Sequence, residues 1–217
     1  MSHGCTRSDG RMTIMNISTT DNMIFQFLET SFQNVRSSKR TDELHNALLC
    51  EFLRNNPDHT HLNWRQEYRL QKDAFGGTFD IDIVGLDDDG NIKVAILAKA
   101  MNSNINKNIK NYANTTIGES ARLYYAPNVT KHIDKILFVS VLPMVAPRFN
   151  KKGDVVGFDD VVGAKDRTNI NKVLQTQYNG KVQSIDLLYS IKDVREGTNV
   201  SDYQTITPTS ISSFPEV

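Results

Sequence analysis

The sequence predicts an α/β fold in which a central mixed β-sheet is flanked by helices. Two apolar runs, IKVAILAKA (92–100) and KILFVSVLP (135–143), are typical of central strands covered on both faces. The Asp89-Gly90 pair just before the first run is a strong signal for a hairpin turn. Helix-like and strand-like segments follow one another in the order helix, strand, hairpin, helix, strand, helix, strand, which favours a sheet with helices packed on its faces.

The first half of the chain contains two expected helices and three expected strands. Apolar residues at helical spacing predict a helix within 22–36. A second helix begins at a cap, Thr41 or Asp42, carries a stripe of leucine and phenylalanine, and ends at 55–57, Asn-Asn-Pro. The segments WRQEYRLQ (64–71) and FDIDIVG (79–85) are expected to be strands, and the second forms a hairpin with 92–100.

The second half is expected to alternate between helices and strands. Residues 102–124 are Asn-rich but keep apolar residues at helical spacing, which predicts one or two helices with a break near Thr115-Thr116. A long loop over 143–160, a helix near 166–176 and a strand near 182–189 follow. We expect a flexible N-terminal segment over 1–20, a single domain over 21–194 and a peripheral C-terminal tail over 195–217.

Composition is that of a soluble globular protein. The chain has 217 residues and 24.5 kDa, with 39% hydrophobic and 23% charged residues, which suits one domain with a sizeable core. No apolar run is long enough to span a bilayer, and the N-terminus lacks the apolar stretch of a secretory signal. The chain has only two cysteines, Cys5 and Cys50, which fits a reducing compartment, so the expected location is the cytoplasm and no membrane partner is expected.

The formal net charge of zero conceals an uneven distribution of charged residues. Acidic residues dominate 72–90, whereas the charged residues of 101–153 are basic apart from Glu119 and Asp134. An acidic locus beside a basic stretch is what a metal-dependent enzyme acting on a polyanion requires. Two ordinary solvated surfaces would give the same pattern, and charge alone favours this second explanation.

Charged residues in the hairpin 79–100 are the main candidates for chemistry. Side chains two apart on a strand share a face, so Asp80 and Asp82 are expected to project together, as are Leu97 and Lys99. Burying such charges is costly unless they pair or bind a cation. Carboxylates hold Mg²⁺, which polarises a phosphodiester and lowers the pKa of bound water, and an ammonium group steadies the developing negative charge.

This succession of motifs resembles the PD-(D/E)xK nuclease superfamily, whose best-known members are type II restriction endonucleases. The resemblance covers roughly residues 40–142. It rests on DELHNALL with Glu43, QEYRL with Glu67, GTFDIDIVG, AILAKA, IGESARL with Glu119 and Arg122, and the strand KILFVSVLP. It implies a restriction endonuclease-like fold and a magnesium-dependent endonuclease that hydrolyses double-stranded DNA, acting as a homodimer.

The resemblance has one departure, since the position of the family's second acid, two residues before the lysine, holds Leu97. Leucine cannot bind a metal. Three explanations stay open. The acid has moved to the following helix as Glu119, or Glu43 from the first helix completes the site. In the third explanation, the site is inactive and the protein binds DNA without cutting it.

The resemblance assigns roles to eight residues. The catalytic candidates are Asp82, Lys99 and Glu119; the metal ligands are Asp82 with Asp80 or Glu43; and the DNA-binding residues are Lys107, Lys110 and Arg122.

Several of these residues also have an ordinary structural explanation. Lys99 can extend its ammonium into water, Glu119 can pair with Arg122 one turn away, and Glu67 can pair with a neighbouring arginine. An α/β domain unrelated to nucleic acid is the remaining alternative.

Overall fold

A six-stranded mixed sheet forms the centre of the protein. The computed structural model covers residues 1–217 and describes all of them except 1, 9–10, 18–22, 30–31, 33–37 and 162–164. The strand order is β10-β9-β6-β5-β4-β3, in which β5, β6 and β9 are parallel to one another and the other neighbours are antiparallel. The strands are β3 (Asn63–Leu70), β4 (Phe79–Leu86), β5 (Ile92–Ala100), β6 (Lys135–Pro143), β9 (Val182–Ile191) and β10 (Pro208–Ile211).

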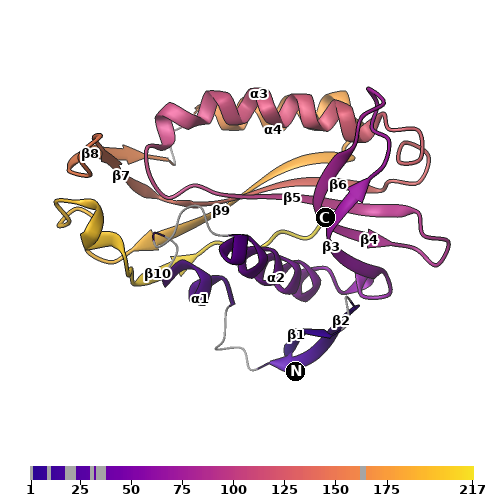
Figure 1. Ribbon diagram of the computed structural model, residues 1–217, viewed down its shortest axis with the longest axis horizontal. Coiled ribbons are helices and arrows are strands. Elements are labelled where there is room, and N and C mark those ends of the chain that lie inside the picture. Colours follow the sequence, from indigo (N-terminus) through magenta and orange to yellow (C-terminus); the bar gives the residue numbers. More distant parts are fainter. Residues whose placement is uncertain (1, 9–10, 18–22, 30–31, 33–37, 162–164) are drawn as a thin grey trace.

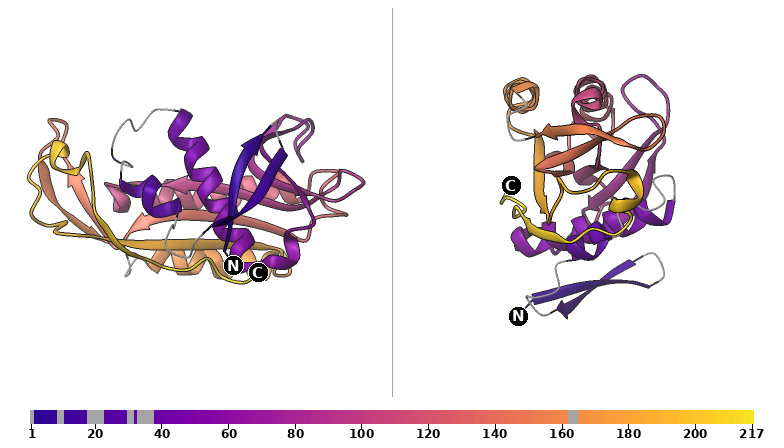
Figure 2. Two further views of the ribbon diagram at one scale, coloured as in Figure 1. Left: turned by 90° about the horizontal axis from the view of Figure 1, so that it is seen from below. Right: turned by 90° about the vertical axis from the view of Figure 1, so that its left-hand side faces the viewer.

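Helices cover both faces of this sheet (Figure 1). Helices α1 (Met23–Glu29) and α2 (Ser38–Asn55) lie on one face, and α3 (Ile105–Tyr124) and α4 (Lys165–Gln177) lie side by side on the other, as Figure 2 shows. Short 3₁₀ turns occur at η1 (Pro57–His59) and η2 (Val200–Tyr203). Helix α3 connects the parallel strands β5 and β6, and this connection places its inner face over the ends of β4 and β5.

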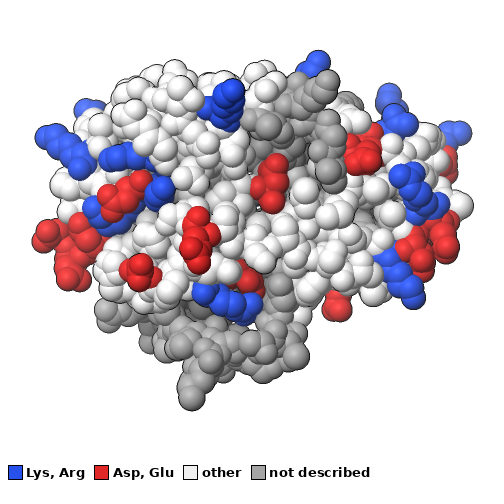
Figure 3. Space-filling model, turned by 180° about the vertical axis from the view of Figure 1, so that it is seen from behind, with Lys and Arg blue, Asp and Glu red and all other residues white. Residues whose placement is uncertain are grey.

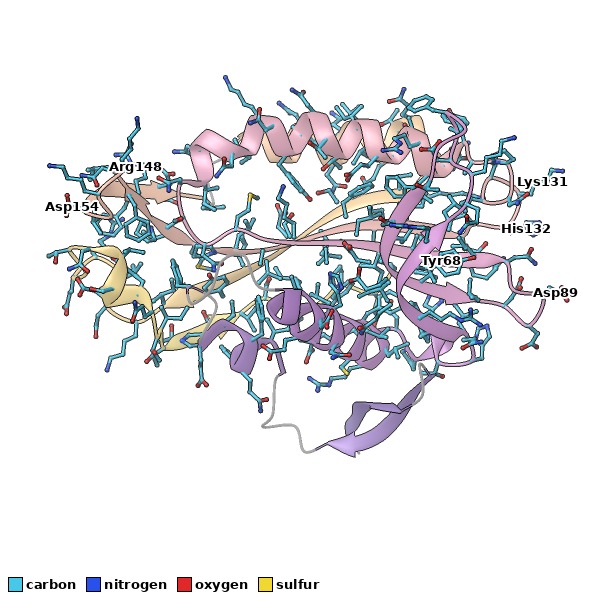
Figure 4. All side chains as sticks on the ribbon, in the orientation of Figure 1. Tyr68, Asp89, Lys131, His132, Arg148 and Asp154 are labelled. Carbon is cyan, nitrogen blue, oxygen red and sulfur yellow. The ribbon has the colours of Figure 1, made fainter. Side chains whose placement is uncertain are left out.

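Two hairpins lie outside the central sheet. Strands β1 (Ser2–Ser8) and β2 (Arg11–Ile17) pair antiparallel, as do β7 (Val145–Phe149) and β8 (Val155–Asp160). In Figure 4 the labelled residues Arg148 and Asp154 mark the end of the molecule that carries the β7–β8 hairpin, and Asp89 and Lys131 mark the opposite end.

The two faces of the sheet have separate apolar cores. On the α2 side, Phe52 packs against Trp64 and Phe214 with ring centroids 5.3 and 5.5 Å apart. On the α3 and α4 side, Leu123 and Leu174 pack against strand residues such as Phe138. Aromatic pairs of this kind stabilise the fold by more than their buried area alone provides, so they help to hold α2 against the sheet.

The α/β class, the mixed sheet and the order of its elements are confirmed, and three local expectations are wrong. Helix α2 begins at Ser38, so the expected caps Thr41 and Asp42 lie inside it. Helix α3 is continuous through Thr115-Thr116, because buried Thr116 and Ser120 face the sheet and the Ser120 hydroxyl bonds the Thr116 carbonyl at 2.6 Å. The expected loop 143–160 contains the β7–β8 hairpin.

The segment 195–217 is part of the core rather than a peripheral tail. It supplies strand β10, which pairs with β9, and it buries Tyr203, Ile206 and Phe214. The segment 1–20 contains the β1–β2 hairpin, and the expectation that it is flexible stays a prediction. Among the described residues, none of the helices has the length and apolar content needed to cross a membrane.

Two glycines test how tightly the sheet and α3 are packed. A Cβ at Gly85 would lie 2.9 Å from Leu62 and 3.0 Å from Trp64, whereas a Cβ at Gly118 would meet nothing within 4 Å. Gly85→Ala should therefore destabilise the fold by about 1–3 kcal/mol through overpacking. Gly118→Ala should stabilise it by roughly 0.5–1 kcal/mol, because glycine is unfavourable inside a helix. Urea unfolding of both variants checks the opposite signs; equal effects would contradict this account of the packing.

Candidate functional site

The regular alternation of side chains along strand β4 is interrupted at Asp82. Ile83 packs in the core on the α2 side, whereas Ile81 packs in the core on the α3 and α4 side. Regular alternation would place these two residues on the same face. Asp82 is therefore the residue at which the strand changes face. Asp80 and Asp82 nevertheless line one cavity, which agrees with the expectation that they project together.

The neighbouring strand β3 changes face at the facing position. The register pairs Gln66 with Ile83 and Tyr68 with Ile81, which puts Glu67 opposite Asp82. Gln66 bonds Asn46 of α2 at 2.8 Å, whereas Tyr68 packs on the α3 side. Glu67 has a φ of +51°, a left-handed conformation that is uncommon and costly for a residue other than glycine.

The change of face brings the Asp82 carboxylate into the gap between β4 and β5. The ladder between these strands runs only to the pair Ile83 and Ile96. Beyond it, Asp82 Oδ2 accepts the backbone N–H of Ala98 at 2.7 Å. A side chain thus takes the place of a backbone acceptor, and Asp82 reaches groups on both sides of the sheet.

A cavity of about 330 Å³ lies beside Asp82 on the α3 side. Its walls come from β4, β5, β6 and α3, and they consist of Asp80, Asp82, Leu97, Ala98, Lys99, Tyr112, Thr115, Glu119 and Phe138. Lys99 lies over the ring of Tyr112, with its ammonium 5.5 Å from the ring centroid, and the Tyr112 hydroxyl bonds Ser140 at 2.7 Å. Asp82, Lys99 and Glu119, the three catalytic candidates, therefore face a single cavity.

Burial and neighbouring charges raise the pKa of two of the three carboxyl groups that line this cavity, those of Asp82 and Glu119. Burial raises the pKa of Asp82, and the bond from the Ala98 N–H opposes that shift. Burial also raises the pKa of Glu119, and the charge of Asp82 raises it further while Lys99 lowers it. The Glu119 carboxyl is therefore close enough to Asp82 and to Lys99 for both charges to affect its pKa, as expected for ionisable groups held together in a cleft.

Other predicted ligands do not join this group. Asp80 lines the cavity, but its two oxygens accept from Arg69 at 2.7 and 2.9 Å, a pairing that lowers the Asp80 pKa. Glu43 is exposed on α2 and is absent from the cavity wall. Leu97 lines the cavity with an apolar side chain where the family pattern has an acid.

The predicted DNA-binding residues differ in their exposure and in their contacts within the chain. Lys110 is exposed on α3, whereas the side chain of Lys107 lies outside the described residues. Arg122 is used within the chain: it donates to buried Asp73 at 2.7 Å and to the Thr78 carbonyl at 3.1 Å, and it stacks on Phe79. On the face seen in Figure 3, acidic and basic side chains are intermixed rather than separated into two regions.

Two residues near Asp82 were not among the sequence candidates for the site. His45 of α2 is 1% exposed; its Nδ1 lies 2.9 Å from Glu67 Oε1 and its Nε2 lies 3.8 Å from Asp82 Oδ1. One donor atom from each of His45, Glu67 and Asp82 can be chosen so that all lie within 4.8 Å of one another. The sequence contained one signal for His45, its position next to Leu44 at the edge of the apolar stripe of α2. A histidine buried at such a position needs a polar partner.

Removing the charge of Asp82 should stabilise the metal-free protein. Because folding raises the pKa of Asp82, the folded state loses stability as pH rises and the carboxyl ionises. Asp82→Asn, measured by thermal unfolding in EDTA, should therefore gain up to about 1 kcal/mol at neutral pH, and the gain should shrink in acid. Asp80→Asn is the matched control: pairing with Arg69 lowers the Asp80 pKa, so its loss should destabilise at neutral pH. A destabilised Asp82→Asn protein would contradict the conclusion that burial disfavours the ionised form of Asp82.

Comparison with known proteins gives no match. No protein-family model matches the chain, and no curated protein and no solved structure matches it significantly. The likeness to a nuclease superfamily therefore depends on the motifs in the sequence and on the side chains that the fold brings together.

Proposed function

We propose that this protein is a magnesium-dependent endonuclease that hydrolyses a phosphodiester bond of double-stranded DNA. The observation that supports this most directly is that Asp82, Lys99 and Glu119 line one cavity although they come from three different elements. Two acids and a lysine around a cleft large enough for a phosphate and waters provide what metal-assisted hydrolysis requires.

The residues of the cavity fit a hard cation. Asp82 uses Oδ2 for its bond to Ala98 and has Oδ1 as a second acceptor, and Glu119 adds a half-buried carboxyl beside it. Carboxylate oxygens are the ligands that Mg²⁺ prefers. Mg²⁺ would supply a polarised phosphoryl oxygen and a more acidic water. Glu119 takes the place of the acid missing at Leu97.

Lys99 stabilises negative charge in this proposal. Its ammonium lies over the ring of Tyr112, and Tyr112 is hydrogen-bonded to Ser140, so the ammonium has a defined position at the cavity. An ammonium held in this way favours the extra negative charge that develops on a phosphate during hydrolysis. Exposed Lys110 on α3 would contact the phosphate backbone, and a restriction-type enzyme cutting a palindrome would act as a homodimer.

Leu97 favours a second candidate function. If Glu119 does not act as a ligand, the cavity has one fewer acid than the family pattern and the protein binds DNA without hydrolysing it. Such a protein would show salt-dependent DNA affinity but no metal-dependent cleavage.

A plasmid-nicking assay distinguishes these functions. Wild type should nick supercoiled DNA with Mg²⁺ and not with EDTA, and Asp82→Ala or Lys99→Ala should lower the rate by at least about 100-fold. Lys192→Ala and Asp89→Asn replace exposed charges away from the cavity and should cut like wild type. DNA binding without cutting by wild type would support the second candidate, and neither activity would leave the nucleic-acid proposal without support.

A rescue experiment tests whether Glu119 replaces the acid missing at Leu97. Glu119→Gln alone should reduce Mg²⁺-dependent nicking by about 100-fold, because it removes a charged ligand but keeps the shape. Leu97→Glu together with Glu119→Gln should restore part of that loss, since Leu97 and Glu119 line the same cavity. Leu97→Glu in the wild-type background is the control for disruption of the cavity. Full activity of Glu119→Gln would refute the role of Glu119.

A further inference from the structure

The buried imidazole of His45 lacks the partners that a buried polar ring normally has. It is 1% exposed, and neither ring nitrogen makes a hydrogen bond with any part of the chain that the structure describes. Most buried polar side-chain groups in proteins are satisfied, and an unsatisfied one costs about 1–3 kcal/mol. The position of His45 between two carboxylates therefore needs an explanation.

Glu67 and His45 approach each other closely without forming a hydrogen bond. Nδ1 and Oε1 are 2.9 Å apart, a hydrogen-bonding distance, yet the oxygen lies too far off the N–H direction for a hydrogen bond to form. When nitrogen and oxygen both bind one metal ion at about 2.1 Å, an oxygen at this separation lies about 45° off the nitrogen lone pair. The separation of the two atoms and the lack of a hydrogen bond between them are both compatible with donors that share an ion.

The backbone is also arranged to hold these donors together. Glu67 adopts its costly left-handed conformation at the point where β3 and β4 both change face, opposite Asp82. Strain of this kind persists where the surrounding structure enforces it, and it is concentrated at binding sites. Helix α2 brings His45 to the same point, with Nε2 at 3.8 Å from Asp82 Oδ1.

We propose that His45, Glu67 and Asp82 form a binding site for a first-row transition-metal dication on the α2 side of the sheet. One imidazole nitrogen with two carboxylates suits Mn²⁺ or Zn²⁺, whereas Mg²⁺ favours an all-oxygen shell. Asp82 belongs both to this site and to the cavity on the α3 side. The inference concerns metal binding alone and does not require the cavity to hydrolyse anything.

The competing explanation is a protonated His45 held as an ion pair between Glu67 and Asp82 without metal. Among the described residues, the charged groups that face the ring are these two carboxylates, and one imidazolium between them would offset part of their repulsion. The two explanations differ in whether the folded chain takes up an ion through a nitrogen ligand.

The experiment uses the full chain, stripped of metal with EDTA and titrated with Mn²⁺ in excess Mg²⁺. Electron paramagnetic resonance should show one tightly bound Mn²⁺ per chain, and pulsed measurements on the wild type should show coupling to an imidazole nitrogen. His45→Gln should lose that coupling and weaken Mn²⁺ binding by at least about 10- to 100-fold. His61→Gln, which replaces an exposed histidine, should behave like wild type.

Further variants keep the inference open to refutation if His45→Gln does not fold. Glu67 is 54% exposed, so Glu67→Gln should fold and should weaken Mn²⁺ binding while leaving nitrogen coupling in the bound fraction. Wild-type protein that binds no Mn²⁺, or binds it without nitrogen coupling, overturns the inference.

Lys99→Ala separates this inference from the proposed function. It should abolish nicking but keep the nitrogen-coupled Mn²⁺. A wild type that binds Mn²⁺ in this way but does not nick DNA would refute only the nuclease.

Discussion

The carboxylate of Asp82 accepts the backbone N–H of Ala98 at 2.7 Å, and the arrangement of the cavity depends on that bond. It occupies the point where the β4–β5 ladder ends and where β4 changes face. A carboxylate in the gap between two strands is accessible from both sides of a sheet, which a regularly alternating residue is not. The acids and the lysine on the α3 side and the imidazole on the α2 side all converge on this one group.

Holding charged groups at the middle of a sheet has an energetic cost that other parts of the fold offset. Burial raises the pKa of both Asp82 and Glu119, which means that their ionised forms are disfavoured in the folded protein. Glu67 adds backbone strain, and His45 adds a buried ring without hydrogen bonds to the described chain. The two apolar cores, with the aromatic cluster around Phe52 on the α2 side, supply the compensating stability.

Leu97 and Glu119 both line the cavity in this arrangement. Leu97 faces α3, and Glu119 on that helix faces the same cavity. An acid from either element can therefore supply charge to the same space, because α3, β4 and β5 all contribute to the wall of this cavity. Arg122, one turn after Glu119, instead fixes the loop before β4 through Asp73 and stacks on Phe79, and in this way ties the helix to the strand that carries Asp82.

Sequence by itself determined the α/β class, the order of the elements, and Asp82 and Lys99 as residues of neighbouring strands that line one cavity. These follow from hydrophobic periodicity and from short motifs along single strands. Only the tertiary structure decided which other groups approach Asp82. The change of face at Asp82 and Glu67 breaks the period-two alternation of β3 and β4, and no local pattern encodes it. His45 of α2 lies buried beside Asp82 while Glu43 is exposed, because packing of the apolar face of α2 against the sheet sets which side chains of the helix point inward.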